Sequence, residues 1–392
     1  MSETLSVVIC TGPPEYPLNK QNWRLARELH SRGNHVTLVL DLQREDLVGN
    51  SEYGSIATWP SSHPVSIKDF SFFWRLLKRT RPDAILANFS SVYVAMTAGF
   101  LRRVPIRIAW YRSLSDQRRL DSAPESVSRS LLTSLAKSVA FRLATHIVPV
   151  SAVARDDLCG QYELPPEKCT VITTRRLDPA EELGTSHVAS PAGCRIVCVG
   201  RLVPSKGQDV LLQAFARLRE LEPEWPVVLE LIGGGPEHEA YAGLADKLGI
   251  RDRVELSGQV DHREVYARAA RADVMVVPYR TDAGPGVIAE GLGLGLPLVA
   301  CATGAMPELL GGSGAVRFVP PDDPVAMADV LREILGNPRM RATMSREARE
   351  LFVQKFHIDS WIEDVIRLLE SASRDAGLAS ASRPPKVLRT NP

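Results

Sequence analysis

The side chains best suited to chemistry in this 392-residue chain lie just beyond predicted strands in its second half. Arg201 and Lys206 follow the apolar strand 195–200, on a loop that also holds Pro204 and Gly207. A guanidinium, which can bind two oxygens at once, and a compact ammonium can together neutralise a diphosphate. The alternative is that both are ordinary surface cations on a solvated loop. The loop indicates a phosphate site if neighbouring loops carry matching groups.

A matching group follows the apolar strand 274–279. Gly286 and Val287 begin a predicted helix, so their backbone N–H groups have no partner inside the helix and can bind an anion. Glu290 lies one turn further along an otherwise apolar helix, where a carboxylate must meet water or a hydroxylated ligand such as a ribose diol. The alternative is a glutamate favoured there by the helix dipole. With Asp282 at the start of the loop, these groups predict a nucleotide-sugar site.

Three consecutive glycines, 233–235, follow another predicted strand, and the loop after strand 297–300 ends in Glu308. A dinucleotide-binding fingerprint would need a glycine where His238 stands, and the first half has no matching glycine loop, which argues against a nicotinamide-dependent enzyme. A tight turn between strand and helix is the simpler interpretation of the glycines. The sequence contains no Asp-x-Asp, G-x-S-x-G, H-E-x-x-H or P-loop motif, so no metal-bridged diphosphate site is expected.

The elements that must position these residues alternate between strand and helix, as in a parallel α/β sheet. The predicted strands span residues 5–10, 35–40, 83–88, 106–110, 146–151, 195–200, 227–232, 254–258, 274–279, 297–300 and 315–319. The predicted helices span residues 20–33, 92–103, 126–143, 152–158 (with Ser151 as N-cap), 209–220, 238–249, 262–271, 324–335 and 339–369. Ligands bind at the carboxyl ends of parallel strands, so the loops described above should converge on one edge of a sheet.

A chain of this length exceeds one ordinary core, and two domains are expected. The small and polar segment 184–193 is the best linker candidate. We therefore expect an N-terminal domain at 1–186 and a C-terminal domain at 193–356. The predicted fold class is α/β, with two Rossmann-like domains facing each other across a cleft. From 371 to 392 the chain has almost no core-forming residues, which predicts a disordered tail.

The charge of the chain is nearly balanced but unevenly distributed. A formal net charge of +1 excludes a globally basic nucleic-acid binder. Residues 68–142 nevertheless hold 14 Lys and Arg against 5 Asp and Glu, a local excess of +9. Within them the aromatic and basic segment 70–81 has the spacing of an amphipathic helix. This pattern favours either contact with an anionic membrane or an ordinary core-facing helix with a basic outer face.

The six cysteines are scattered without metal-ligand spacing, which is typical of a reduced, cytoplasmic protein without a metal. No basic segment precedes a long apolar run at the N-terminus, so no signal peptide is expected. The most apolar stretch, 287–305, reaches membrane-spanning length but contains Glu290, four glycines and Pro297, and it splits into a short helix and a strand. Localisation is therefore expected to be cytoplasmic, with peripheral contact at the inner face of the membrane left open.

Three long segments, 199–218, 231–260 and 272–300, resemble the donor domain of the large retaining glycosyltransferase family 4. Segments 146–158 and 356–370 are similar to the same family, and the resemblance is weaker before residue 195. It implies the GT-B fold, in which a helix matching residues 357–370 crosses back onto the first domain.

The resemblance also implies roles for individual residues. The cations matching Arg201 and Lys206 bind the donor diphosphate. Two glutamates separated by seven residues match Asp282 and Glu290; the second holds the ribose, and the first lies near the sugar ring. The backbone around Gly258–Val260 contacts the base, and no metal is required.

Three departures from the family pattern stand out. The first glutamate is Asp282, one methylene shorter, which puts its sugar contact in doubt or suits a different sugar. The first-domain loop, often Gly-Gly, reads Thr-Gly-Pro-Pro here and leaves Gly12 as the one close-approach residue for the donor. The histidine commonly found after the strand 106–110 is absent, and Arg112 follows instead. Arg112 is therefore a candidate for binding a phosphate or an acidic group on the acceptor side.

We expect an enzyme, a retaining glycosyltransferase that moves a sugar from a UDP- or GDP-sugar to a hydroxyl of a glycan or lipid-linked acceptor in surface polysaccharide or glycoconjugate biosynthesis. Arg201, Lys206 and Asp282 are the catalytic candidates, the cations acting with the helix amides on the leaving diphosphate. Alanine at either cation should lower turnover far more than stability. The alternatives are a sugar-nucleotide epimerase or phosphorylase of the same fold, and a non-catalytic donor-binding partner subunit.

Overall fold

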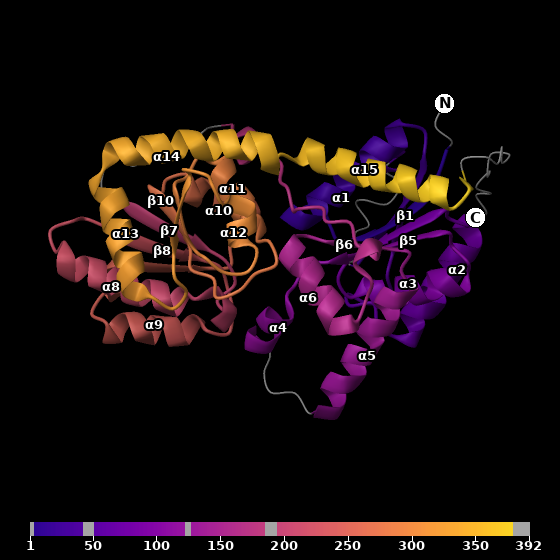
Figure 1. Ribbon diagram of the computed structural model, residues 1–392, viewed down its shortest axis with the longest axis horizontal. Coiled ribbons are helices and arrows are strands. Elements are labelled where there is room, and N and C mark those ends of the chain that lie inside the picture. The colour runs from indigo at the N-terminus through magenta and orange to yellow at the C-terminus, as the bar shows by residue number, and fades with distance from the viewer. Residues whose placement is uncertain (1–3, 42–50, 122–126, 185–193, 379–392) are drawn as a thin grey trace.

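The computed structural model describes residues 4–41, 51–121, 127–184 and 194–378, which fold into two α/β domains (Figure 1). Each domain is built around a six-stranded sheet. All the strand pairings in both sheets are parallel. The predicted α/β class therefore holds, with one parallel sheet in each half of the chain.

The N-terminal sheet has the strand order β3-β2-β1-β4-β5-β6. Its strands are β1 (Ser6–Thr11), β2 (His35–Leu40), β3 (Ser55–Thr58), β4 (Ala84–Ala87), β5 (Ile106–Tyr111) and β6 (His146–Pro149). Its helices are α1 (Pro17–Ser31), α2 (Ile67–Thr80), α3 (Ser91–Leu101), α4 (Ser115–Asp121), α5 (Val127–Leu143) and α6 (Ala152–Tyr162). All six residues of β1 are buried, as expected for a parallel strand covered on both faces.

The C-terminal sheet has the order β12-β11-β10-β7-β8-β9. Its strands are β7 (Arg195–Val199), β8 (Val228–Ile232), β9 (Val254–Gly258), β10 (Val274–Val277), β11 (Leu298–Cys301) and β12 (Val316–Val319). Its helices are α8 (Gln208–Leu221), α9 (His238–Lys247), α10 (His262–Ala269), α11 (Gly286–Gly293), α12 (Met306–Leu310), α13 (Pro324–Gly336) and α14 (Pro338–Leu351). The short elements β3, α4 and α12 were not predicted, because segments of four to seven residues carry little periodic signal.

Each sheet has one point where the strand order reverses, and the loops on either side of it diverge. In the N-terminal sheet it lies between β1 and β4, and in the C-terminal sheet between β7 and β10. Ligands of open parallel sheets bind at the carboxyl ends of the strands beside such a point. The loops singled out in the sequence after β7 and β10 flank the reversal in the C-terminal sheet.

The single helix predicted over 339–369 is wrong. The chain instead forms α14, a π-helical turn (Phe352–Phe356), an extended residue His357 and then α15 (Ile358–Asp375), which runs from the C-terminal domain along the N-terminal one (Figure 1). Phe352 is buried in the core of the C-terminal domain and Trp361 in that of the N-terminal domain. One straight helix could not bury Phe352 and Trp361 in two different cores. The break lets α14 and α15 each pack against the core of its own domain.

The disorder predicted from residue 371 is also wrong at its start. Helix α15 continues to Asp375, because Ala372 and Ser373 prolong its buried face. Residues 379–392, the rest of that prediction, lie outside the described residues.

Helix α7 (Pro179–Leu183) falls within the predicted N-terminal domain, yet it packs against α10 and α11 of the C-terminal domain. Leu183 contacts the core of that domain, so the connection between the domains begins before α7. Of the predicted linker, only Gly184 is described; residues 185–193 lie outside the described residues.

The aromatic and basic segment forms α2, capped by reciprocal hydrogen bonds between Ser66 and Asp69. Phe73 and Leu77 are buried in the core, and the Arg102 guanidinium stacks 3.9 Å from the centre of the Trp74 ring. These contacts agree with the core-facing interpretation. Among the described helices none has the length and hydrophobicity needed to span a membrane, and the apolar stretch 287–305 divides into part of α11 and the strand β11.

Candidate active site

Lys206 and Asp282 meet across the reversal point of the C-terminal sheet. Lys206 follows β7 and Asp282 follows β10, and their side chains form an ion pair in which both are largely buried, with 12% and 9% of the side-chain surface exposed. The Lys206 ammonium also lies 3.9 Å from the centre of the Tyr279 ring, a cation–π contact. The structure therefore brings together two of the three predicted catalytic residues.

The Asp282 loop is fixed by backbone contacts. Gly284 N–H donates to the Asp282 carboxylate at 2.9 Å, and Ala305 N–H donates to the Asp282 carbonyl at 3.0 Å. Gly304 has a positive φ of 51°, and a side chain there would collide with the Asp282 carbonyl. The loop after β11 thus supports the loop after β10, which orients the Asp282 carboxylate towards Lys206.

Glu290 is buried on α11 and is held by two residues that sequence reasoning missed. Its Oε1 lies 3.0 Å from Arg176 Nε and 3.4 Å from His262 Nε2. Burial raises the pKa of Glu290, but its contacts with His262 and Arg176 outweigh that effect, and the pKa lies below its usual value. Glu290 is therefore a charged carboxylate in a buried setting, held by two cationic or hydrogen-bonding partners.

Arg176 lies at the first turn of α11. It comes from the segment that follows β6 and α6, and only 6% of its side-chain surface is exposed. A side chain at Gly286 would collide with the Arg176 guanidinium, so glycine is required there for this approach. Val287, the second predicted amide donor, is partly buried against the C-terminal core. The amino end of α11 thus lies between a cation of the connecting segment and Asp282.

Arg201 differs from the other predicted residues because it is exposed. No hydrogen bond or ion pair joins its side chain to another described residue. Its carbonyl accepts a hydrogen bond from the buried Gln208 side chain at 2.9 Å, which anchors the backbone of the loop. The cation is therefore free to reach a ligand.

The glycine triplet has a packing role. A side chain at Gly233 would collide with the Gly200 carbonyl, and one at Gly235 with the Leu202 carbonyl. Gly233 N–H donates to the Gly258 carbonyl at 2.9 Å, so the triplet joins the loops after β7 and β9. The glycines therefore allow the backbones of separate loops to approach closely, which goes beyond the simple turn between strand and helix that the sequence suggested. Near Gly258, the side chain of Val260 packs partly buried against the C-terminal core.

The two N-terminal candidates occupy the carboxyl ends of β1 and β5. Gly12 is buried and packs so closely against the Asn19 side chain that a larger residue would collide with it. Arg112 stacks 4.4 Å from the centre of the Trp110 ring, and its Nε donates to Asn88 Oδ1 at 3.0 Å. Arg112 therefore lies next to the reversal point of the N-terminal sheet.

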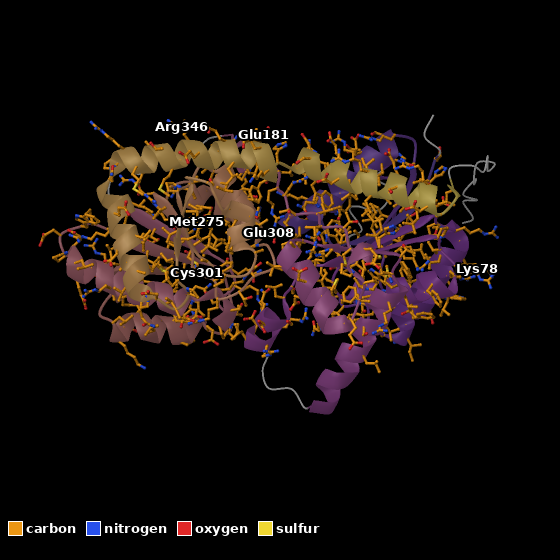
Figure 2. The ribbon with its side chains drawn as sticks, viewed as in Figure 1. Lys78, Glu181, Met275, Cys301, Glu308 and Arg346 are labelled. Carbon is orange, nitrogen blue, oxygen red and sulfur yellow. The ribbon has the colours of Figure 1, made fainter. Side chains whose placement is uncertain are left out.

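The loop that ends in Glu308 connects the domains instead of contributing a free carboxylate. Glu308, labelled where the two domains meet in Figure 2, accepts hydrogen bonds from Ala152 N–H at 2.8 Å and Val153 N–H at 3.2 Å. Ser151 caps the same helix, α6, as predicted, and its hydroxyl donates to the Ala283 carbonyl at 2.6 Å. Glu308 thus satisfies the amino end of a helix in the other domain.

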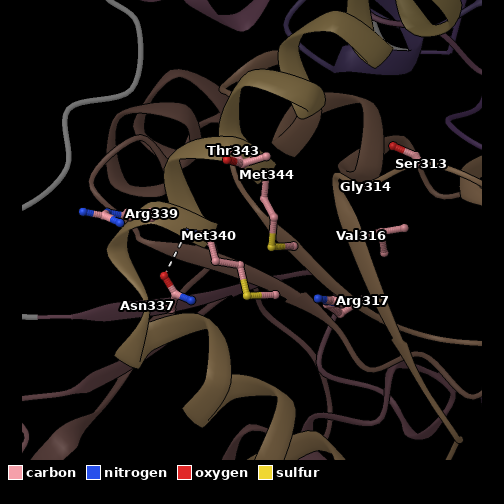
Figure 3. Close-up of a pocket in the computed structure, with 9 residues that line it drawn as sticks. All are labelled: Ser313, Gly314, Val316, Arg317, Asn337, Arg339, Met340, Thr343 and Met344. Atoms are coloured by element: carbon pink, nitrogen blue, oxygen red, sulfur yellow. Dashed lines mark hydrogen bonds between the residues drawn. The ribbon is translucent and has the colours of Figure 1, made fainter.

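A surface pocket of the C-terminal domain lies away from these residues. It is formed between the amino end of β12 and the helix α14, where Asn337 caps α14 through Met340 N–H (Figure 3). The candidate site lies at the carboxyl ends of the strands, so this pocket is not part of it. No cluster of metal-binding side chains is found within the described ranges.

Arg176 and His262 could not have been selected from the sequence. Arg176 lies in a loop with a neighbouring arginine, and His262 starts an amphipathic helix, as many surface histidines do. Only the folded chain places both beside Glu290. The one local signal was the apolar helix around Glu290, since a carboxylate that is buried there needs a partner of opposite charge.

Comparison with known proteins gives a consistent picture across the chain. Residues 18–174 match the family model Glycosyltransferase Family 4, and residues 190–351 match Glycosyl transferases group 1. Among curated proteins, the chain is 35% identical over 174 residues to a GDP-mannose-dependent alpha-(1-6)-phosphatidylinositol monomannoside mannosyltransferase of Mycolicibacterium smegmatis, covering 42% of this chain and 44% of that protein. It is 30% identical over 207 residues to a D-inositol 3-phosphate glycosyltransferase of Corynebacterium efficiens, covering 50% and 49%. The chain thus spans about half the length of these relatives.

Solved structures extend the similarity to the whole fold. Sucrose-phosphate synthase from Thermosynechococcus elongatus superposes with a TM-score of 0.77 at 19% identity, covering 95% of this chain and all of that one. HepE of Anabaena in complex with UDP superposes with a TM-score of 0.71 at 18% identity, covering 94% and 100%. At such identities the likeness establishes the two-domain GT-B architecture.

Proposed function

Because the chain belongs to glycosyltransferase family 4, we propose that it is an enzyme that transfers a sugar from a nucleotide-diphosphate sugar to an acceptor hydroxyl. The observation that carries this proposal is the meeting of Lys206, Asp282 and the amino end of α11 at the reversal point of the C-terminal sheet. A cation and free helix amides suit a diphosphate, and Glu290 one turn further suits a ribose.

In the proposed reaction the bond between the anomeric carbon and the diphosphate breaks towards an oxocarbenium-like sugar, and the acceptor hydroxyl forms the new bond on the same face of that sugar. The diphosphate leaves with the electron pair, and the hydroxyl proton is released. Lys206, Arg201 and the amides of Gly286 and Val287 would stabilise the charge that grows on the leaving group. Asp282, which pairs with Lys206, would face the sugar once the diphosphate takes over the contact with the Lys206 ammonium.

The base and sugar of the donor are expected to be those of a UDP- or GDP-sugar. The GDP-mannose in the name of the Mycolicibacterium smegmatis relative supports the guanosine option. The backbone at Gly258–Val260 is the proposed base contact, and Gly12 the proposed close approach from the N-terminal domain. We propose transfer with retention of configuration and without a resident metal; the anomeric configuration of the product, determined by NMR, tests the first of these points.

The acceptor is proposed to be a glycan or a lipid-linked molecule of a surface polysaccharide or glycoconjugate. Phosphatidylinositol monomannoside in the name of a relative supports a lipid-linked acceptor. The exposed basic residues of α2, among them Arg75, Lys78 and Arg79, would hold the protein on an anionic membrane surface. Lys78, at the outer end of the N-terminal domain in Figure 2, points away from the core.

Nucleotide release from a panel of UDP-, GDP- and ADP-sugars, with membrane extract as acceptor source, tests the proposal. Release with one nucleotide class, reduced at least about tenfold by Lys206→Ala, is the expected result. Nucleotide binding without release in every combination would refute the transferase and support a donor-binding partner subunit. Conversion of the sugar nucleotide without an acceptor would support an epimerase.

A further inference from the structure

Apart from the exposed Arg201, one cation near the candidate site has no carboxylate partner among the described residues. Lys206 pairs with Asp282, and Arg176 pairs with Glu290. No carboxylate within the described ranges forms an ion pair with Arg112, whose contacts are with the neutral side chains of Asn88 and Thr174 and with an aromatic ring. Arg112 is thus a partly buried cation without a carboxylate partner among the described residues.

The position of the Arg112 guanidinium is fixed from three sides. Its Nε donates to Asn88 Oδ1 at 3.0 Å, an Nη1 donor lies 3.4 Å from Thr174 Oγ1, and its plane lies over the Trp110 ring at 4.4 Å. Trp110 stacks in turn on Trp361 of α15, with ring centres 5.5 Å apart. A guanidinium has five N–H donors, so three remain unused in a preorganised fork.

A second unused donor lies beside it. Asn88 follows β4 and is only 6% exposed, and while its Oδ1 accepts from Arg112, its Nδ2 has no partner among the described residues. Burying an amide N–H without a hydrogen bond is costly, which favours a ligand that accepts from it. Burial and, secondarily, the neighbouring Arg176 cation lower the pKa of Arg112 to about 9, so a bound anion would relieve an unfavourable charge.

We propose that Arg112 and Asn88 form a binding site for an anionic group, a phosphate or a carboxylate, carried by the acceptor. This proposal rests on the proposed transferase function. The cations proposed for the donor diphosphate, Lys206 and Arg201, belong to the C-terminal domain, whereas Arg112 and Asn88 lie at the carboxyl ends of β5 and β4 in the N-terminal sheet. The Arg112–Asn88 site therefore belongs to the N-terminal domain, which is the proposed acceptor side. Arg176 separates it from Glu290.

The first test measures anion binding directly. Inorganic phosphate is titrated by calorimetry into the full chain saturated with the nucleoside diphosphate it binds, which fills the donor site. Arg112→Gln should weaken phosphate binding at least about tenfold, because it removes a bidentate, charge-assisted contact. Arg102→Gln is the matched control, since Arg102 also stacks on a tryptophan (3.9 Å from the Trp74 ring centre) but at the end of α3. Equal phosphate binding in wild type and Arg112→Gln overturns the proposal, whether or not the protein proves to transfer sugar.

The second test identifies the source of the anion. Membrane extract is separated on an anion exchanger into anionic and neutral pools, and labelled sugar is supplied from donors with neutral sugars or with a uronic acid. We expect labelled sugar to appear in the anionic pool when the donor sugar is neutral. Arg112→Gln should raise the KM for that pool at least about tenfold, and Arg112→Lys should restore the KM in part. Equal KM effects on both pools, or an effect confined to uronic acid donors, would overturn the assignment to the acceptor.

Discussion

The Lys206–Asp282 ion pair predicts that Lys206 has two separable roles, one in stability and one in turnover. The sequence led us to expect that replacing Lys206 would lower turnover far more than stability. The structure revises this expectation, because the ammonium and the carboxylate are 12% and 9% exposed. Removing one partner of a buried pair leaves the other charge unpaired and costs about 3–5 kcal/mol. Asp282 keeps its hydrogen bond from Gly284 N–H, so the lower figure applies to Lys206→Met.

The double variant separates the two roles. Lys206→Met and Asp282→Asn should each lower the free energy of unfolding by about 3 kcal/mol, whereas the double variant should lose no more than about 1 kcal/mol, since it leaves neither charge unpaired. Donor turnover should instead fall about 100-fold or more in Lys206→Met and should not recover in the double variant. Urea unfolding at pH 7, followed by circular dichroism, measures stability, and nucleotide release measures turnover.

Asp273→Asn is the matched control, because it breaks another ion pair of the same domain, with Arg341, at the amino ends of β7 and β10. It should lower stability by about 1–2 kcal/mol, given the 20% and 6% exposure of the Arg341 and Asp273 side chains, and keep turnover within about twofold of wild type. The reasoning fails if turnover of the Lys206 variant returns with stability in the double variant. It also fails if the two substitutions add to about 6 kcal/mol, since the residues would then not be coupled.

Three further results are expected. Arg201→Ala should change stability by no more than about 0.5 kcal/mol, because the side chain is exposed, and should weaken calorimetric binding of the nucleoside diphosphate about tenfold; unchanged binding would remove Arg201 from the site. Glu290→Gln should lower stability by about 3 kcal/mol at pH 7. Because the pKa of Glu290 is depressed in the folded chain, its stabilisation is complete above its unfolded pKa of about 4.3 and is lost as pH falls through the folded value. The variant should therefore lose less stability than wild type in urea unfolding between about pH 5 and 3, and parallel pH profiles would contradict this. The double variant Arg75→Glu/Lys78→Glu on α2 should weaken co-sedimentation with anionic vesicles at least about threefold, whereas Arg339→Glu/Arg346→Glu on α14 should not. Equal effects of both double variants would mean that the vesicles respond to overall charge and not to the surface of α2.

The loops after β7 and β10 could be predicted because their signals are local. Buried parallel strands read as apolar runs, and the charged or glycine residues that end them mark the carboxyl edge of the sheet. Lys206, Asp282 and Glu290 were found in this way, and the structure places the first two in contact. The role of the glycine triplet needed the folded chain, because the backbones it admits belong to separate loops.

The remaining features depend on long-range packing. The segment between α14 and α15 contains no proline or glycine from which the break could have been predicted. The break follows from the need to bury Phe352 and Trp361 in different cores, and it is fixed by a hydrogen bond from Arg176 N–H to the Phe356 carbonyl at 2.8 Å. Arg176 likewise reaches Glu290 from 114 residues away, a relation that no local pattern encodes.

The pairing of charges also bears on how a donor would be recognised. Lys206 and Glu290, the proposed diphosphate and ribose ligands, are already satisfied by Asp282 and Arg176. A donor must replace Asp282 at Lys206 and Arg176 at Glu290, so its net binding free energy is the difference between two sets of strong interactions. An anion bound at Arg112 would displace no carboxylate. Arg176 also donates through its backbone to the turn that joins α14 to α15. Arg176 therefore contacts both the proposed ribose ligand, through its side chain, and the segment that links the two domains, through its backbone.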